Sequence, residues 1–309
     1  MGSSASQFDL PLGVAISADT LTLWVAENGN NRISIWTRPN GASTSWSNST
    51  TFGSAGSGPS NFSSPQGIAV SADELTIWVV EHANHRVSVW TRPDVGSTTW
   101  TNNTTFGGFG SASDKFKYPR GIYASADKLT VWVADTDNAR ISIWNRPDAG
   151  STSWTNVSTF GSYGSGPENF DGPWDIALSA DMLAAWITEP GNGRVSIWVR
   201  PNGASTSWSN STTFGTQGTA ASEFNNPRGI AVSSDTLTVW VVDCYNNRIS
   251  IWRRLSTGAT TWTNDTTFGS LGNGANQFYY PGYLALSPNE TTMWVADTAH
   301  NAISIWNYA

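Results

Sequence analysis

The chain has 309 residues, 18 of them Trp, and only 13% of its residues are charged. A formal net charge of −7 excludes the basic surface that attracts nucleic acids and anionic membranes, so we expect neither partner. The single cysteine, Cys244, excludes an intramolecular disulfide and a thiolate metal cluster within one chain.

The first six residues, from Met1 to Ser6, look like the remainder of an expression tag. We therefore expect the folded domain to comprise residues 7–309, and we predict no localisation from this terminus. Further along, no apolar run reaches the about 18 residues that a membrane-spanning helix needs.

A tryptophan recurs through the whole chain at a constant spacing. A fixed period of this size is typical of solenoids, propellers and arrays. No linker interrupts the series, so we expect six similar units in one closed domain. The recurring residues are Trp24, Trp78, Trp132, Trp186, Trp240 and Trp294.

The unit from Pro65 to Gly107 predicts four short strands and no helix. β-Branched and aromatic residues dominate its apolar stretches, and turn residues separate them about every 10 positions. An Asp at position 73 is expected to hydrogen-bond its own backbone in the first turn. The expected strands are residues 67–70, 75–80, 86–90 and 98–107.

The second of these strands carries apolar residues on both faces. Leu75, Ile77 and Val79 lie on one side, and Trp78 and Val80 lie on the other. Both faces are buried when each small sheet is a blade packed between two neighbours around an axis. The repeats of a β-helix are much shorter. The sequence therefore predicts an all-β fold, a six-bladed β-propeller.

The last unit is incomplete. Six complete units at this spacing would be longer than the chain, which stops after the third strand of unit six, at Ile303 to Trp306. Gln7 and Phe8 align with Asn61 and Phe62, so no upstream segment supplies the missing strand. We expect a sixth blade without its outer strand, whose exposed edge could pair with a second molecule. The chain is then a monomer or associates weakly through that edge.

Two units share sixteen identical residues, 38–53 and 200–215. Packing alone would accept many substitutes on an outer strand. This identity points to recent amplification or to an engineered origin, and leaves open a propeller without a selected ligand.

The repeated block resembles the NHL repeat, which has Pro-x-Gly-Ile-Ala-Val, then Val-Ala-Asp, then Asn-x-Arg-Ile. The segments 133–141 and 241–249 fit this pattern well, and the match extends over all six units. The resemblance implies a six-bladed propeller. The functions it implies range from protein and RNA binding to, in related propellers, lyases and lactonases. Departures are the richness in Trp, and Ala302 and His300 in place of the Arg and Asn of the last unit.

An acid at the end of each second strand is followed five residues later by Arg in five units. A ring of carboxylates could hold a metal or act in acid–base catalysis. Because the pair is present in nearly every unit, we interpret it as part of the scaffold. The acids are Glu27, Glu81, Asp135, Glu189, Asp243 and Asp297.

The three histidines do not predict a zinc site. His82 and His85 share one loop, whereas His300 belongs to unit six, which is not adjacent to unit two. We therefore expect no metal and no cofactor.

The better functional signal lies where the units differ. The residue after each unit's first Pro should lie at the rim of the central channel, and the next position is Gly except in units four and six. Neutral variation in loops is the alternative explanation. Aromatic rings beside charged groups on one concave face can hold a peptide or a sugar. The predicted ligand-binding residues are Arg120, Trp174, Asp175, Arg228 and Tyr283.

From these features we expect a binding or scaffold propeller without catalysis, whose ligand is a protein, peptide or glycan. The alternative is a metal-dependent enzyme similar to propeller lyases and lactonases. RNA binding through the same face is a third possibility, which the net charge of −7 disfavours.

Overall fold

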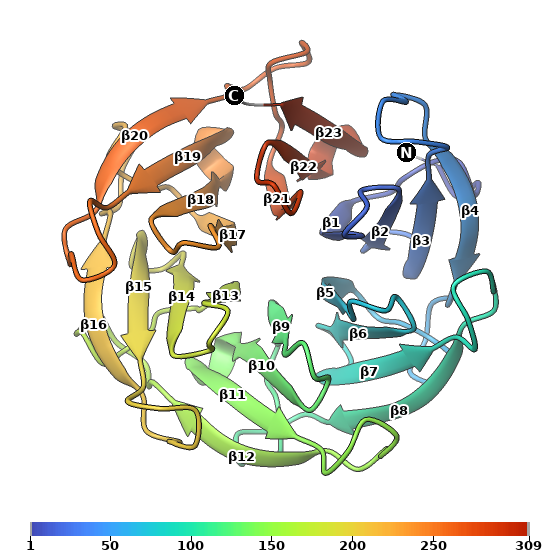
Figure 1. Ribbon diagram of the computed structural model, residues 1–309, viewed down its shortest axis with the longest axis horizontal. Helices are drawn as coiled ribbons and strands as arrows, with labels where there is room; N and C mark the ends of the chain where they lie inside the picture. Colours follow the sequence, from blue (N-terminus) through green and yellow to red (C-terminus); the bar gives the residue numbers. More distant parts are fainter. Residues whose placement is uncertain (1, 308–309) are drawn as a thin grey trace.

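The computed structural model describes residues 2–307 and contains six antiparallel sheets arranged as blades around one axis (Figure 1). Five sheets have four strands and the last has three. Each blade is built from strands that follow one another in the chain, from the axis outward. The predicted six-bladed propeller is confirmed.

The first three blades comprise twelve strands. Blade one holds β1 (Pro11–Ile16), β2 (Thr22–Glu27), β3 (Arg32–Thr37) and β4 (Ser47–Phe52). Blade two holds β5 (Pro65–Val70), β6 (Thr76–Glu81), β7 (Arg86–Thr91) and β8 (Thr101–Gly107). Blade three holds β9 (Ile122–Ala124), β10 (Thr130–Asp135), β11 (Arg140–Asn145) and β12 (Thr155–Phe160).

The other three blades comprise eleven strands. Blade four holds β13 (Ile176–Leu178), β14 (Ala184–Glu189), β15 (Arg194–Val199) and β16 (Ser209–Phe214). Blade five holds β17 (Pro227–Val232), β18 (Thr238–Asp243), β19 (Arg248–Arg253) and β20 (Thr263–Phe268). Blade six holds β21 (Pro281–Leu286), β22 (Thr292–Asp297) and β23 (Ala302–Asn307).

Three short 3-10 helices join the second and third strands of blades three, five and six. They are η1 (Thr136–Asn138), η2 (Cys244–Asn246) and η3 (Thr298–His300). No helix among the described residues is long and apolar enough to cross a membrane.

The core consists of side chains between adjacent blades. Trp132 on β10, for example, is buried in one cluster with Ile176 and Ile187 of blade four. The six recurrent Trp residues are all essentially inaccessible to solvent. Burial of such large rings on both faces of every blade supplies the apolar contact that holds the ring of blades together.

The turn between the first two strands of each blade forms as expected. In blade two, Asp73 Oδ1 accepts hydrogen bonds from Ser71 Oγ at 2.6 Å and from the backbone N–H of Leu75 at 3.2 Å. Glu74 between them has a left-handed backbone, with φ of 59°. The Asp therefore fixes a tight turn by bonding nearby backbone.

The repeated acid and Arg form a buried pair in five blades. In blade two, Arg86 Nε lies 2.9 Å from Glu81 Oε1, and Glu81 is fully buried. The same guanidinium donates to the carbonyls of Ser57 and Gly58 in the loop before the blade. The pair thus ties each blade to the preceding connection, and its interpretation as scaffold is confirmed.

Blade six has three strands, as predicted. Its edge strand, β23, pairs with β22, and residues 2–7 form no strand beside it. The outer strands β4, β8, β12, β16 and β20 curve along the rim, which is open between β20 and β4 (Figure 1).

Residues 2–6 lie in the position of a blade connection, although the sequence set them apart from the fold. Arg32 donates to the carbonyls of Ser3 and Ser4 as Arg86 does to those of Ser57 and Gly58. Each of these residues precedes its blade-two counterpart by one period of the repeat. They serve here as the first connection of the propeller.

Candidate functional site

The first strands of the six blades approach one another closely at the axis. Four of the six blades carry Gly at the second position after the first Pro of the unit, because no space is left there for a side chain. A Cβ on Gly67 would lie 2.4 Å from the carbonyl oxygen of Arg120, and one on Gly121 would lie 2.6 Å from the Cα of Asp175. Asp175 and Tyr283 are therefore the two side chains that this inner ring admits.

The residue directly before this position in each blade lies at the rim of the channel. Here two arginines converge on one indole. Arg120 Cζ lies 3.7 Å from the centroid of the Trp174 ring, and Arg228 Cζ lies 4.4 Å from it. Trp174 belongs to blade four, yet it clusters with Leu12 of blade one across the axis. Cation–π attraction and this packing hold the two guanidinium groups over the channel.

Neither guanidinium forms a salt bridge with a carboxylate in the described residues. Arg120 Nη1 donates to Gln66 Oε1 at 3.3 Å, and Arg228 Nε donates to Asn226 Oδ1 at 2.8 Å. Burial lowers the pKa of Arg120 to about 10. The rim thus keeps two positive charges without an internal counterion, which suits an anionic ligand.

Asp175 lies beside Trp174 and is only 7% exposed. Its Oδ2 accepts a hydrogen bond from the backbone N–H of Ile230, at 3.0 Å, on the first strand of blade five. Burial raises the pKa of Asp175 to about 7, against the opposing effect of the backbone N–H groups of Ile230 and Ile176. A carboxyl group with this pKa exchanges a proton readily near neutral pH.

Tyr283 is the second side chain of the inner ring and is likewise buried. Its hydroxyl has no hydrogen bond of good geometry within residues 2–307, and neither has Nε of Arg120. Burial raises the pKa of Tyr283 well above its ordinary value. The Trp174 indole lies close to the hydroxyl and opposes this rise. Buried polar atoms without partners often mark a place where a ligand or water binds.

These side chains border a small cavity on the axis. It has a volume of about 110 Å³, and first-strand residues of all six blades line it. Besides Asp175 and Tyr283, its lining residues are Gly, Val, Ile and Leu of the first strands. Burial raises the pKa of Asp175, because the charged form loses its hydration there.

One residue of this site escaped the sequence analysis. Thr188 Oγ1 accepts a hydrogen bond from the backbone N–H of Asp175 at 3.0 Å and donates to the carbonyl of Arg228 at 2.6 Å. It thereby links two of the predicted site residues. A signal was present, since the position before the repeated acid is Ala or Val in the other five units.

The structure thus brings all five predicted site residues together at the axis, although ligand binding by them stays a prediction. The remaining candidates lie elsewhere. His300 Nδ1 is 2.7 Å from Asp297 Oδ2 and takes the place of the Asn that contacts the acid in the other units, and His85 Nδ1 accepts a hydrogen bond from the backbone N–H of Tyr118. Burial raises the pKa of Cys244 to about 11, so this thiol is a poor nucleophile.

Metal ligands do not gather in the described part of the chain. No group of three or more His, Cys, Asp or Glu side chains there is arranged to hold an ion. The donor set does not fit the metal site that the alternative enzymatic hypothesis implies.

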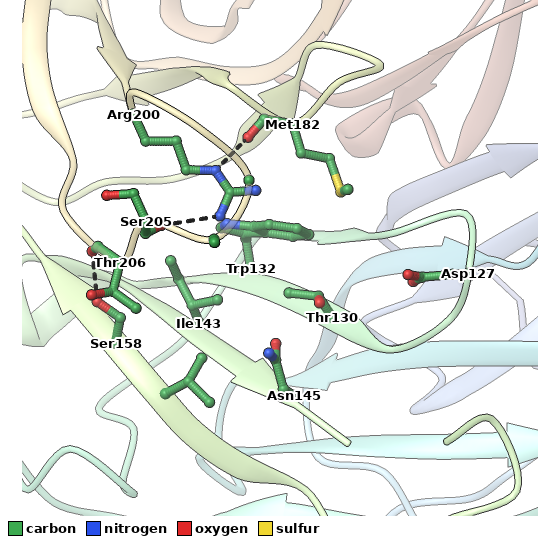
Figure 2. Close-up of a pocket in the computed structure, with 13 residues that line it drawn as sticks. Asp127, Thr130, Trp132, Ile143, Asn145, Ser158, Met182, Arg200, Ser205 and Thr206 are labelled. Atoms are coloured by element: carbon green, nitrogen blue, oxygen red, sulfur yellow. Dashed lines mark hydrogen bonds between the residues drawn. The ribbon is translucent and has the colours of Figure 1, made fainter. Parts of the chain in front are cut away.

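A larger groove, of about 460 Å³, opens between blades three and four (Figure 2). Arg200 extends over Trp132 there and donates to the carbonyls of Met182 and Ser205. These residues belong to the repeated part of each unit. The groove is therefore a product of blade packing and not a counterpart of the axial site.

Comparison with known families supports the repeat assignment. Residues 62–90 and 224–252, in units two and five, match the model of the NHL repeat. The resemblance to NHL repeats is confirmed at these two positions. A search of curated proteins found no match to the chain.

Solved structures of similar fold include several enzymes. A putative 6-phosphogluconolactonase from Bacteroides uniformis is 15% identical, with a TM-score of 0.65 over 96% of this chain and 80% of that one. The periplasmic gluconolactonase of Pseudomonas aeruginosa is 15% identical, with a TM-score of 0.62 over 97% and 81%. A streptogramin B lyase is 16% identical, with a TM-score of 0.56 over 98% and 84%.

These matches correct two predictions. The expectation of a non-catalytic binding or scaffold propeller, and with it the expectation that the chain is no enzyme, is wrong, because lactonases and a lyase are among the matching structures. That expectation rested on the repeated acids and the histidines, and it gave Asp175 a role in ligand binding alone. At 15–16% identity the likeness by itself establishes the fold alone.

Proposed function

We propose that the chain is a propeller enzyme that hydrolyses small anionic lactones at its axial site. The observation that carries the proposal is Asp175, a carboxyl of pKa about 7 on the wall of the axial cavity, next to two guanidinium groups without counterions. The reaction class comes from the gluconolactonases among the proteins of similar fold.

Asp175 acts in this scheme as the general base. Its carboxylate accepts a proton from water as the water oxygen attacks the lactone carbonyl carbon. The ring C–O bond then breaks, and the proton passes from Asp175 to the alkoxide oxygen that leaves. The product is the open hydroxy acid, and the carboxylate is restored.

The neighbouring groups stabilise charge. The Tyr283 hydroxyl, which has no hydrogen bond of good geometry in the described structure, donates one in this scheme to the carbonyl oxygen as it becomes negative. Arg120 and Arg228 bind the anionic substituent of the substrate at the rim. Trp174 is only 9% exposed and lies between them, so in this scheme the ring moves aside when a substrate enters from the rim.

The test is hydrolysis of glucono-1,5-lactone and of its 6-phosphate near pH 7, measured above the spontaneous rate by acid release. We expect turnover of both and preference for the phosphate ester. Asp175→Asn should lower kcat/KM by about 100-fold or more, the usual contribution of a general base. The exposed Asp114 gives the control, and Asp114→Asn should leave the rate unchanged. Equal rates with wild type and Asp175→Asn would refute the proposal.

A further inference from the structure

The open junction between blades six and one, which we call the seam, lacks one strand. It comprises β23 together with Phe268 of blade five and Trp36 and Trp46 of blade one. Ile305 on β23 is 42% exposed, whereas its counterpart Ile143 in blade three is 4% exposed. The rim is open at this point (Figure 1).

The blade-one side of the seam lacks a phenylalanine. At the next junction Phe52 stacks on Trp100, with centroids 5.6 Å apart, and lies 4.9 Å from Trp90. Trp46 and Trp36 are the residues one period earlier. Phe8, the counterpart of Phe62, lies 4.8 Å from Trp36, but the described residues offer no counterpart of Phe52. Trp46 is accordingly half-buried, although its four counterparts are buried: Trp100, Trp154, Trp208 and Trp262.

The blade-five side lacks a tryptophan. Phe268 contacts Trp306, with centroids 4.7 Å apart. Trp306 is tilted against Phe268, and within residues 2–307 no second indole of blade six stacks parallel to it. Four equivalent Phe residues each have such a second, stacked indole. Those stacked pairs are Phe52–Trp100, Phe106–Trp154, Phe160–Trp208 and Phe214–Trp262.

A cavity of about 300 Å³ lies at the seam between blade six and blade one. It repeats the groove of Figure 2, because its lining residues stand three periods of the repeat from those of that groove: Thr292 and Thr130, Ile305 and Ile143, Arg38 and Arg200. The outer strand β12 contributes Val157 and Ser158 to the lining of that groove, and Ser158 is labelled in Figure 2. Among the described residues, none occupies the equivalent positions of Val157 and Ser158 at the seam.

We propose that the seam binds one extended peptide strand of the type Trp-Thr-Asn-x-Thr-Thr-Phe. The strand adds to β23 by backbone pairing, with its Phe opposite Ile303 and its Asn opposite Trp306, as in the register of β20 on β19. Its Trp stacks on Phe268, and its Phe fills the gap between Trp36 and Trp46.

A second folded copy does not meet these requirements. The five strands of this type already belong to blades one to five, so a partner copy would open its own ring by giving one up. The free edge strand of such a copy, β23, carries Ile303 and Ile305 and not the Trp and Phe spacing of the proposed strand. The occupant is therefore a peptide segment that carries the motif, not the edge of a second propeller.

The test uses a fluorescein-labelled peptide with the sequence of residues 261–270, TWTNDTTFGS, and the full chain. Fluorescence anisotropy should give saturable binding with one peptide per chain. Replacing the Phe or the Trp of the peptide by Ala should weaken binding about tenfold each, the effect of losing one aromatic pair. A scrambled peptide should not bind. Absence of saturable binding, or equal affinity of the Phe→Ala peptide, would overturn the proposal.

Two protein variants locate the site. Ile305→Lys should abolish peptide binding, whereas Val157→Lys, at a residue equally exposed at 43% in the groove of Figure 2, should not. Thermal unfolding of both variants checks that they fold. Equal loss with both variants would overturn the assignment to the seam. So would sedimentation showing a wild-type dimer that Ile305→Lys dissociates and the peptide does not.

Discussion

The propeller holds two kinds of buried carboxyl group, and their surroundings separate scaffold from site. Glu81 at the end of β6 has Arg86 at 2.9 Å and Asn84 at 2.6 Å as partners, an arrangement that recurs around the ring. Asp175 on the axis occurs once and has backbone N–H partners but no cation bonded to it. Repeated acids therefore hold blades together, whereas the single acid is free to exchange a proton. Uniqueness within a repeat marks function better than residue type does.

The largest effect is expected from breaking the scaffold pair. Arg86→Ala leaves the fully buried Glu81 without its cation, which typically costs about 3–5 kcal/mol of unfolding free energy. Activity per folded molecule should not change, because the pair lies away from the axis. Urea unfolding followed by Trp fluorescence measures the loss.

The exposed pair of Arg253 and Asp265 provides the matched control. Its charged atoms are 3.3 Å apart and both side chains are about half exposed, so Arg253→Ala should cost no more than about 1 kcal/mol. Similar losses in the two variants would mean that burial does not distinguish the repeated pair.

A second effect concerns the pH dependence of stability. Asp175 has a pKa of about 7 in the folded chain, against an ordinary value of 3.8, so the folded chain holds the proton more tightly. Its contribution to stability is therefore complete below about pH 4 and is lost as the pH rises through about 7. The loss amounts to at most about 4 kcal/mol for a pKa difference of about three.

Asp175→Asn should remove this dependence and stabilise the protein at pH 8 relative to wild type, with a much smaller difference at pH 4. Urea unfolding at the two pH values measures it. If the two proteins lose stability in parallel between pH 4 and pH 8, Asp175 is not the buried carboxyl group of raised pKa that its surroundings indicate.

A smaller effect is expected at the rim. Arg228→Gln removes one of the two guanidinium groups that lack a carboxylate partner and should raise KM for the phosphorylated lactone about tenfold, or about 1.4 kcal/mol. Stability should change little, since Arg228 is partly exposed. Steady-state kinetics give the result, and an equal change in KM for the uncharged lactone would argue against anion recognition at this position.

The sequence predicts the architecture almost completely. The constant spacing of the recurrent Trp residues defines six blades, and the strand pattern within each unit matches the sheets that form. Repetition makes such inferences robust, because each feature is observed several times. The convergence of Asp175 and Tyr283 could also be anticipated from the two places where Gly is replaced.

The chemistry of the site could not be predicted in the same way. The proton affinity of Asp175 depends on burial and on Ile230, 55 residues away, which only the folded ring brings within 3.0 Å. The link through Thr188 depends on Arg228, 40 residues away.

The most direct test of the axial site is the pH dependence of lactone hydrolysis by wild type and Asp175→Asn. The carboxylate is the active form, so kcat/KM of wild type should rise about tenfold per pH unit below pH 7 and level off above it. Asp175→Asn should give a low rate without this ionisation, while Asp114→Asn keeps the wild-type profile. A profile without an ionisation near pH 7, or one that Asp175→Asn preserves, would contradict catalysis by Asp175.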